Sequence, residues 1–450
     1  MKVTAISFIP PKAAESNPKL TPELCASVLA RYSRSNEGLT NILSKVDLEN
    51  PEKSIASIFK FVDYGHASIG GLTGGIPIAI DGVSIWMAFK LFELSPYCDG
   101  QESSTRYIEM SEAGLIPAVE LGIDPSIAPQ FDAFGRLAVA TYNEEYRRLD
   151  LLAEMYPNLV GYPENATPKV RERIRKNYAL DRARYFLPLT LRTNIAIVQT
   201  ARAWTDTISG LLSLPHPEAQ AVAERLIAAL NPYAPNLIRH ARRKKGWVHY
   251  SKQEIEFSAH HVRTEGNDVE AASECLVALG TAGPLRRDIQ ERENRYDRCG
   301  FVSRLTSIQV EWSGMAIAEA RDINRHRTGE RFFDATHRGL FLPTEVRLDA
   351  SRETLIRFWE AHQAILRLGV STPLGGVQGA LLPYSLVLGS QGTFYRTTTL
   401  AKFAYEAELR TGPGAHFRYA QHYRDALEKL YPLLRYDDKD SIPIGEAEPE

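Results

Sequence analysis

Two short stretches decide the expected fold: IPIAID at residues 76–81 and SIQVEW at residues 307–312. Aliphatic and β-branched residues dominate the first and alternate with polar residues in the second, and both patterns are typical of β-strands. Each stretch is followed by a segment with helical patterning, at residues 83–94 and 313–324. The order of strand then helix therefore occurs once in each half of the chain.

A second pair of similar stretches supports an internal repeat. FLPLTL at residues 186–191 is echoed by LLPYSL at residues 381–386, and each precedes a helical segment that carries aromatic residues. A period near half the chain is too long for a solenoid of short repeats. It predicts a duplicated chain whose halves form two domains related by a pseudo-two-fold axis.

The composition also favours two globular domains. The chain has 450 residues, and a single hydrophobic core usually stops growing near about 250–300 residues. We place the boundary at the basic segment RHARRKKG, residues 239–246, because a run of like charges usually marks an exposed connection. The expected domains are residues 1–245 and 250–440. We expect each to be an α+β domain, with a mainly antiparallel sheet and helices, so that the chain forms a pseudo-dimer.

Charge and cysteine usage narrow the possible partners. The net charge of −2 gives no basic surface of the kind that nucleic-acid binding requires. The four cysteines form no CxxC pair, so we expect neither a disulfide framework nor a metal site, and a reducing cytoplasmic location fits. Residues 368–395 are uncharged but hold several glycines and two prolines. We interpret them as a buried segment, and we expect no membrane span and no signal peptide.

The helical patterns place the remaining elements along the chain. Helices are expected at residues 22–34, 51–61, 125–155, 168–185, 193–214 and 217–230.

Polar motifs lie at corresponding points of the two halves. The first half carries DYGHAS at residues 63–68, QESSTRY at 101–107, and Arg184 three residues before Leu-Pro; the second carries RHR at 325–327 and Leu-Arg at 409–410. In type and order these motifs resemble the flavin-dependent thymidylate synthases, which carry G-H-x-S, then R-H-R-x-x-S-x-N-E-x-S-x-R-Y, an arginine before V-L-P, and a late Leu-Arg. The resemblance implies reductive methylation of dUMP to dTMP with FAD, NADPH and methylenetetrahydrofolate.

The two halves have lost complementary parts of this pattern. The first half reads LSP at residues 94–96 where RHR would stand, and residues 211–213 replace the late Leu-Arg. The second half has Gly379 in place of the arginine before Leu-Pro, and its RHR is followed by TGERFFDATHR. In the family each site takes residues from two or more chains. The retained residues would therefore build one composite site between the halves, and the lost ones would belong to an abandoned second site.

The resemblance also implies roles for single residues. The dUMP-binding residues would be Glu102, Ser104, Arg106, Arg184 and Arg410, with Arg410 as the catalytic arginine beside the uracil ring. The flavin-binding residues would be His66, Ser68, Arg202, Arg325, His326 and Arg327. A hydroxyl and a guanidinium fork suit a phosphate, and cationic groups stabilise the negative charge of a reduced flavin.

Each motif also has a purely structural interpretation. RHR can satisfy the carbonyls at a helix end, QESSTRY can begin a polar helix, Arg184 and Arg410 can form surface ion pairs, and His66 can be a structural histidine. Two substitutions leave the substrate open, because Gln101 and Asp322 replace the Asn and the Gln of the family pattern. The alternatives are an enzyme acting at C5 of another pyrimidine nucleotide and a non-catalytic nucleotide-binding relative. We expect a homodimer of tandem chains.

Overall fold

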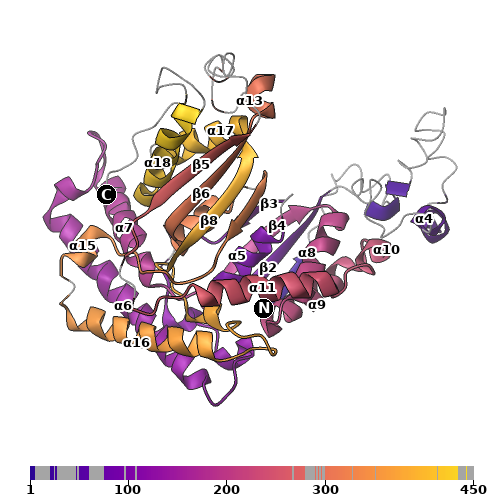
Figure 1. Ribbon diagram of the computed structural model, residues 1–450, viewed down its shortest axis with the longest axis horizontal. Helices are drawn as coiled ribbons and strands as arrows, with labels where there is room; N and C mark the ends of the chain where they lie inside the picture. Colours follow the sequence, from indigo (N-terminus) through magenta and orange to yellow (C-terminus); the bar gives the residue numbers. More distant parts are fainter. Residues whose placement is uncertain are drawn as a thin grey trace. The chain divides into compact units, whose positions relative to one another are not determined.

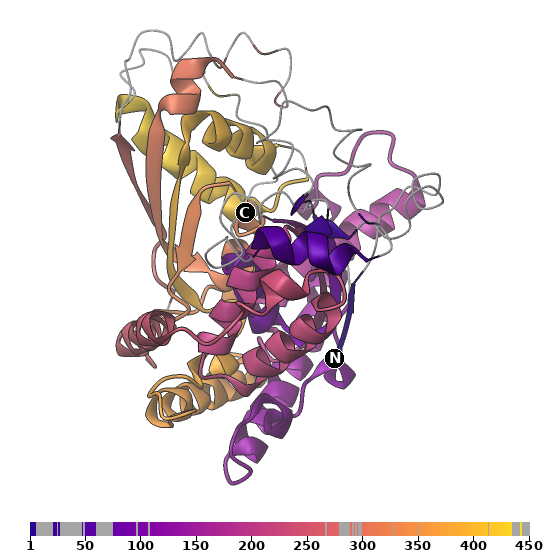
Figure 2. The ribbon, with the colours of Figure 1, turned by 90° about the vertical axis from the view of Figure 1, so that its right-hand side faces the viewer.

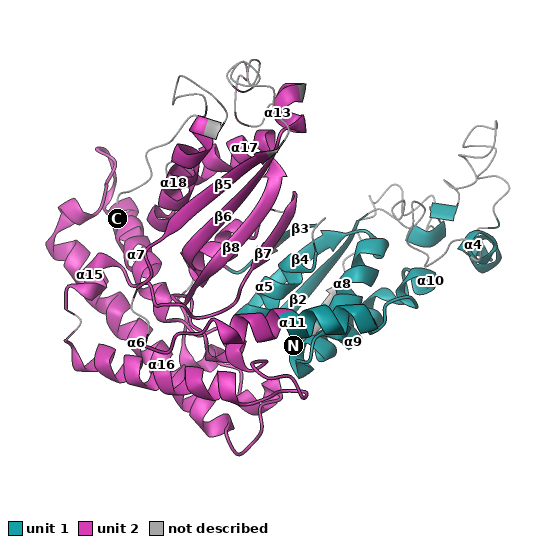
Figure 3. Cartoon of the chain, in the orientation of Figure 1, with its two compact units in different colours: residues 1–103, 192–253 teal, residues 104–191, 254–450 magenta. Residues whose placement is uncertain are grey.

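The computed structural model describes residues 1–5, 21–24, 26–27, 47, 50–59, 75–95, 98–106, 109–265, 268–278, 289, 292, 295, 299–326, 328–349, 351–412, 414–433 and 442. The chain divides into two compact units, residues 1–103 with 192–253, and residues 104–191 with 254–450 (Figure 3). Each unit contains one antiparallel sheet with helices, so the predicted α+β class is confirmed. The segment 104–191 belongs to the second unit. The limits 1–245 and 250–440 therefore stay a prediction about the sequence repeat and do not describe the compact units.

The first unit is built around a four-stranded sheet in the order β1-β2-β4-β3. Its strands are β1 (Lys2–Ala5), β2 (Ile76–Ser84), β4 (Arg192–Gln199) and β3 (Asp99–Glu102). Its helices are α4 (Pro51–Phe59), α5 (Ile85–Glu93), α8 (Ala201–Ser213), α9 (Pro217–Leu230) and α10 (Pro235–Ile238). The chain passes to the second unit within α11 (Lys245–His260).

The second unit repeats this strand order as β5-β6-β8-β7 (Figure 1). Its strands are β5 (Ala272–Ala278), β6 (Ser307–Ala316), β8 (Gln391–Thr399) and β7 (Glu330–Phe333). The helices that accompany this sheet are α13 (Phe301–Leu305), α14 (Ile317–Ile323), α17 (Leu400–Thr411) and α18 (Phe417–Leu433). Two views show α17 and α18, in yellow, together on one face of the sheet (Figures 1 and 2).

A bulge recurs at the same place in both sheets. The register of β2 shifts between Asp81 and Val83, and the register of β6 shifts between Trp312 and Met315. A glycine with positive φ lies in each bulge, Gly82 at 76° and Gly314 at 67°. A bulge of this kind needs a left-handed residue, which glycine adopts without steric cost. The two sheets therefore share their strand order and the position of the bulge, and the internal repeat stays a prediction.

A helical layer completes the second unit. It contains η3 (Glu112–Gly114), η4 (Ala118–Leu121), α6 (Ala128–Met155), η5 (Pro157–Leu159), α7 (Pro168–Ala183), α15 (Thr344–Arg347) and α16 (Glu353–Ser371). The repeated Leu-Pro stretches form the short helices η6 (Arg184–Phe186) and η7 (Leu382–Ser385). They lie side by side, because the Leu189 amide donates to the Leu386 carbonyl at 3.1 Å and the Leu388 amide donates to the Leu187 carbonyl at 2.9 Å.

Two expected helices are wrong in their first part. Residues 313–316, expected to begin a helix, form the end of β6, and α14 starts only at Ile317. Residues 193–199, expected to be helical, belong to β4, where buried side chains alternate with more exposed ones. This period of two, with several β-branched residues, favours a strand, and the helix starts only at Ala201. The helices expected at 51–61, 125–155, 168–185 and 217–230 are present within a few residues of their limits. The helix expected at 22–34 falls mostly outside the described residues.

The uncharged stretch 368–395 is buried as predicted only in its second part, because residues 371, 373, 375, 376 and 378 are exposed. It contains the end of α16, all of η7 and the start of β8, and residues 379–394 are buried without exception. Among the described helices none is both long enough and apolar enough to cross a membrane.

The bulge glycine of the second sheet gives a direct test of the fold. A Cβ at Gly314 would lie 2.8 Å from the Glu270 carbonyl oxygen and 2.9 Å from that of Val269. We expect Gly314→Ala to lower the free energy of unfolding by about 1–3 kcal/mol or more, since strain and backbone clash add. Urea denaturation measures the loss. Gly161→Ala is the matched control, because a Cβ there meets nothing within 4 Å. Equal stability of the two variants would contradict the assigned bulge.

Two buried histidines predict acid sensitivity of the second unit. The rings of His337 and His362 pack edge to face with centroids 4.8 Å apart, and both side chains are buried. Burial lowers the pKa of His337 to about 3, and burial holds the pKa of His362 well below its usual range. Below about pH 6.5 the unfolded chain therefore binds protons that the folded chain does not, so stability falls as pH falls.

Replacing one of these histidines tests the pH dependence. We expect His362→Phe, which keeps an aromatic ring beside Phe134, to reduce the loss of unfolding free energy between pH 7.5 and pH 5 by up to about 2 kcal/mol. Urea midpoints at the two pH values measure it. The exposed His249→Phe serves as the control. An unchanged pH dependence in the His362 variant would show that this ring is not held neutral.

Candidate functional site

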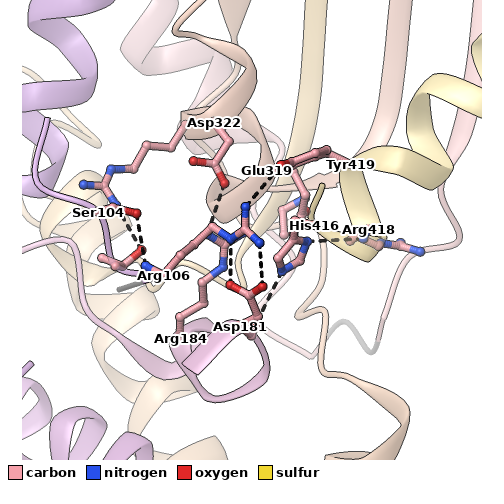
Figure 4. A network of polar contacts seen from close by, with 12 residues as sticks. Ser104, Arg106, Asp181, Arg184, Glu319, Asp322, His416, Arg418 and Tyr419 are labelled. Atoms are coloured by element: carbon pink, nitrogen blue, oxygen red, sulfur yellow. Dashed lines mark hydrogen bonds and ion pairs between the residues drawn. The ribbon is translucent and has the colours of Figure 1, made fainter. Parts of the chain in front are cut away.

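Four arginines from distant parts of the sequence converge within the second unit. Arg106 follows β3, Arg184 begins η6, Arg325 follows α14, and Arg410 lies in the last turn of α17. With the two acids that they surround, Asp181 and Asp322, they form what we name the arginine cluster. Figure 4 shows Arg106 and Arg184 beside these two carboxylates. The elements that carry the cluster therefore come from both halves of the chain.

Arg106 is held by a two-pronged ion pair. Its Nε and Nη2 donate to Oδ1 and Oδ2 of Asp181, both at 2.8 Å, and its Nη1 donates to the Tyr419 hydroxyl at 3.2 Å. The side chain of Arg106 is 14% exposed, so its guanidinium lies at the edge of the cluster. Ser104 is a close neighbour, because its Oγ accepts from the Arg106 amide at 3.3 Å.

Arg184 lies deeper than Arg106 and is incompletely paired. Its side chain is 1% exposed, and its Nη1 donates to Oδ2 of Asp322 at 3.1 Å. Its Nε and Nη2 are buried and have no hydrogen-bond partner. A buried, charged N–H group without an acceptor is destabilising by about 1–3 kcal/mol, so these two donors are unusual in a folded core.

Arg410 links the RHR segment to the cluster. Its Nε donates to Nε2 of His326 at 2.7 Å, and its Nη2 donates to the Asp322 carbonyl at 3.0 Å. Since Nε2 of His326 accepts a hydrogen bond, the ring proton lies on Nδ1, which is 3.9 Å from Oε1 of Glu406. The guanidinium of Arg410 also lies over the Tyr419 ring, 5.1 Å from its centroid.

A buried ion pair holds the backbone at His326 in place. Arg396 of β8 donates to both carboxylate oxygens of Glu406, and neither side chain is exposed. The same guanidinium donates to the carbonyls of His326 and Thr328, at 3.0 and 2.9 Å. These contacts hold the backbone on both sides of residue 327, so the RHR segment is attached to the sheet and not only to the end of α14.

The cluster carries more positive than negative charge. Four guanidinium groups stand against two carboxylates, which leaves a surplus of two positive charges. Burial by itself would raise the pKa of Asp322, but Arg184, Arg325, Arg106 and Arg410 together hold it well below its usual range. Asp322 is therefore ionised at neutral pH and accepts hydrogen bonds only. Chemically, the arrangement suits an anionic ligand that carries several acceptor oxygens.

The structure brings some of the predicted site residues together and not others. Ser104, Arg106, Arg184, Arg325, His326 and Arg410 all lie in or beside the cluster. Glu102 and Arg202 belong to the first compact unit, in β3 and α8. His66, Ser68 and Arg327 lie outside the described residues. The alternative of a surface ion pair is wrong for Arg184, because its side chain is buried.

Asp181 of the cluster, and Tyr419 beside it, were not predicted from the sequence as site residues. Asp181 lies one helical turn before Arg184, and this spacing is a weak signal that both face the same side. Tyr419 has no such signal, because it meets Arg106 across 313 residues of sequence.

In the first unit, the end of α5 has an apolar side chain at the position where the second unit has a cationic one. The side chain of Leu94, at the position of the first arginine of RHR, would lie only 2.9 Å from a Cβ at Gly210 of α8. The neighbouring Ser95 forms a hydrogen bond of 3.0 Å with Thr207 of the same helix. The end of α5 and helix α8 are thus joined without the charges that join the end of α14 to α17.

Comparisons with known proteins agree with the motif-based resemblance. Residues 18–236 match the family model described as thymidylate synthase complementing protein. UPF0159 protein Ta1429 of Thermoplasma acidophilum is 20% identical, over 94% of this chain and 97% of that protein. A structure of the UMP/dUMP methylase PolB from Streptomyces cacaoi, bound with 5-Br dUMP, is 18% identical with a TM-score of 0.33, over 53% of this chain and 93% of that chain. The family match confirms the predicted resemblance for the residues that it spans.

The Arg106–Asp181 pair can be tested through stability. We expect Asp181→Asn to lower the free energy of unfolding by about 1–3 kcal/mol, because it removes the charge that both prongs of Arg106 contact. Chemical denaturation measures the change. Glu172→Gln on the same helix is the control, since its pair with Lys176 is exposed and we expect no measurable effect. If both variants unfold like the wild type, Arg106 does not depend on Asp181.

Proposed function

We propose, from the match of residues 18–236 to the family model described as thymidylate synthase complementing protein, that the chain is a nucleotide methyltransferase acting at one composite site. The proposed reaction is reductive methylation of dUMP to dTMP, with methylenetetrahydrofolate as the carbon donor and with FAD and NADPH. The proposed site is the arginine cluster of the second unit. It would be the single site predicted from the complementary motif losses.

The observation that carries this proposal is the incomplete pairing of Arg184. Its Nε and Nη2 are buried donors without acceptors, in a cluster that already has surplus positive charge. An oxygen of a bound nucleotide would supply the missing acceptor, and a phosphate with about −1.5 to −2 charge would offset the surplus. A purely structural cluster has no need of unpaired donors.

The residues of the cluster suit different parts of a nucleotide. Ser104 and Arg106 offer a hydroxyl and a partly exposed guanidinium, which is the combination that grips a phosphate. Arg410 is the proposed catalytic residue, because a guanidinium beside the uracil ring stabilises negative charge that develops on the ring as C5 becomes nucleophilic. Its bonds to His326 and to the Asp322 carbonyl fix its orientation before a ligand binds.

The described residues do not make up a flavin site by themselves. Of the proposed flavin residues, Arg202 belongs to the other compact unit, and the Nε2 of His326 already accepts from Arg410. Arg325 remains, with a side chain that is 24% exposed. FAD would supply the hydride chemistry. The erosion of the flavin motifs in the sequence favours, as a second candidate, a protein that binds a pyrimidine nucleotide without redox chemistry.

The Asp322 carboxylate is compatible with more than one pyrimidine base. Asp322 is held ionised, so it can accept from the N3–H of uracil or from the 4-amino group of cytosine. Turnover and binding should therefore be compared for dUMP, UMP and dCMP. A preference for UMP or dCMP would favour the alternative of C5 modification of another pyrimidine nucleotide.

Loss of the Arg184 side chain tests the proposed site. We expect Arg184→Ala to weaken dUMP binding by about 10- to 100-fold, the value of one or two charge-assisted hydrogen bonds. Isothermal titration calorimetry measures the affinity and the number of sites, for which we expect one per chain. Arg184→Lys should be intermediate, because it keeps the charge but loses the planar fork.

The matched control is Arg175→Ala, which removes an arginine of α7 that pairs with Asp150 and Glu154. Thermal melting shows whether each variant is folded. Unchanged dUMP affinity in folded Arg184→Ala would overturn the assignment of the site. The visible spectrum with added FAD then separates the two candidates, because a flavin spectrum that shifts with dUMP supports the enzyme and absence of bound flavin supports the nucleotide-binding protein.

A further inference from the structure

A second contact runs parallel to the Arg184–Asp322 ion pair. The Tyr185 hydroxyl donates to Oε1 of Glu319 at 2.5 Å. Tyr185 follows Arg184 directly in η6. Glu319 lies three residues, or about one helical turn, before Asp322 in α14. The two contacts therefore connect the same two elements. Figure 4 includes Glu319 in the same polar network as Arg184. A change at one contact therefore acts directly on the other.

Glu319 is fully buried and has a defined set of neighbours. From its own helix start, the Ala316 amide donates to Oε2 at 2.9 Å. From α18, Nε2 of His422 lies 4.0 Å from Oε2, and neither ring nitrogen of His422 has a hydrogen-bond partner. The charged neighbours that act on Glu319 are Arg418 of α18 and Arg184 of η6.

The effect of these neighbours on the pKa of Glu319 opposes the effect of burial. Burial raises the pKa of Glu319, while Arg418, Arg184 and the Tyr185 hydrogen bond lower it, and the result is a pKa of about 7. Burial keeps His422 neutral by holding its pKa well below its usual range. The Glu319 carboxyl is thus poised between its two protonation states at neutral pH, and one of the cations that set this balance is Arg184.

We propose that Glu319 is a positioning residue that takes up one proton from solvent when an anion binds at Arg184. This inference rests on the proposed nucleotide site. A bound anion neutralises Arg184, so the Glu319 carboxylate loses a stabilising cation. The proton adds to Oε2, which lies 4.0 Å from the unpartnered Nε2 of His422. Neutral Glu319 keeps its contact with Tyr185, so η6 stays in place while Arg184 turns its donors to the ligand.

The test measures protons taken up on binding, with dUMP as the probe. Calorimetric titrations at pH 7.5, in buffers of different ionisation enthalpy, give the number of protons bound per dUMP. The nucleotide phosphate is mostly dianionic at this pH, so it contributes little. We expect the wild type to take up a sizeable fraction of one proton. Glu319→Gln, which mimics the neutral acid, should bind dUMP with almost no uptake, and its affinity should fall less steeply than that of the wild type between pH 7 and 8.5.

A second variant shifts the pH range of the proton uptake and keeps the Glu319 side chain. Tyr185→Phe deletes a hydrogen bond that lowers the pKa of Glu319, so more of the free protein is already protonated at pH 7.5. We expect its proton uptake to shrink at pH 7.5 and to grow at pH 8.5. A merely structural tyrosine would change affinity without shifting this pH profile. If Glu319→Gln does not fold, the Tyr185→Phe profile decides the question.

Asp150→Asn is the control for a general effect of removing an acid. Asp150 pairs with Arg175, which lies nine residues before Arg184, or about 13 Å along a helix. We expect its proton uptake to equal that of the wild type. Equal uptake by the wild type and Glu319→Gln, with dUMP bound by both, would overturn this inference and leave the proposed function intact. No dUMP binding by the wild type would overturn both.

Discussion

The ion pair between Arg184 and Asp322 is the constraint on which the rest of the site depends. It joins η6, from the first half of the chain, to α14, from the second half, and it is buried. Removing one partner of a buried pair typically costs about 3–5 kcal/mol, so the pair strongly favours this arrangement. Yet it satisfies only one of the donors of Arg184. The same contact therefore stabilises the unit and leaves unpaired donors beside three further arginines.

The arrangement around this pair follows from the repeated architecture. Both sheets have the same strand order and the same glycine bulge before the following helix. In the second unit the end of that helix carries Asp322, Arg325 and His326, whereas the first unit has Leu94 packed near Gly210. The segment 104–191 brings Arg106 and Arg184 into the unit that retains RHR and Arg410. One unit thus contains retained residues from both halves of the motif pattern.

The sequence was sufficient for the parts of this account that depend on local pattern. The strands at 76–81 and 307–312, the Leu-Pro stretches and the long helices α6 and α7 are visible because their periodicity lies within a few residues. The strand β4 was missed because its alternating pattern runs almost without a break into α8. Asp181 and Tyr419 were missed because their contacts with Arg106 cross 75 and 313 residues. Local patterns do not reveal pairing over such separations, and the unpaired donors of Arg184 emerge only from the three-dimensional packing.

The most direct test of the central claim is a crystal structure of the chain with dUMP bound. The account predicts one dUMP in the arginine cluster of each chain, with nucleotide oxygens within about 3.2 Å of Nε or Nη2 of Arg184. It also predicts that Asp322 remains in contact with the same guanidinium. A nucleotide bound elsewhere, or one that leaves these two donors without an acceptor, would contradict the account.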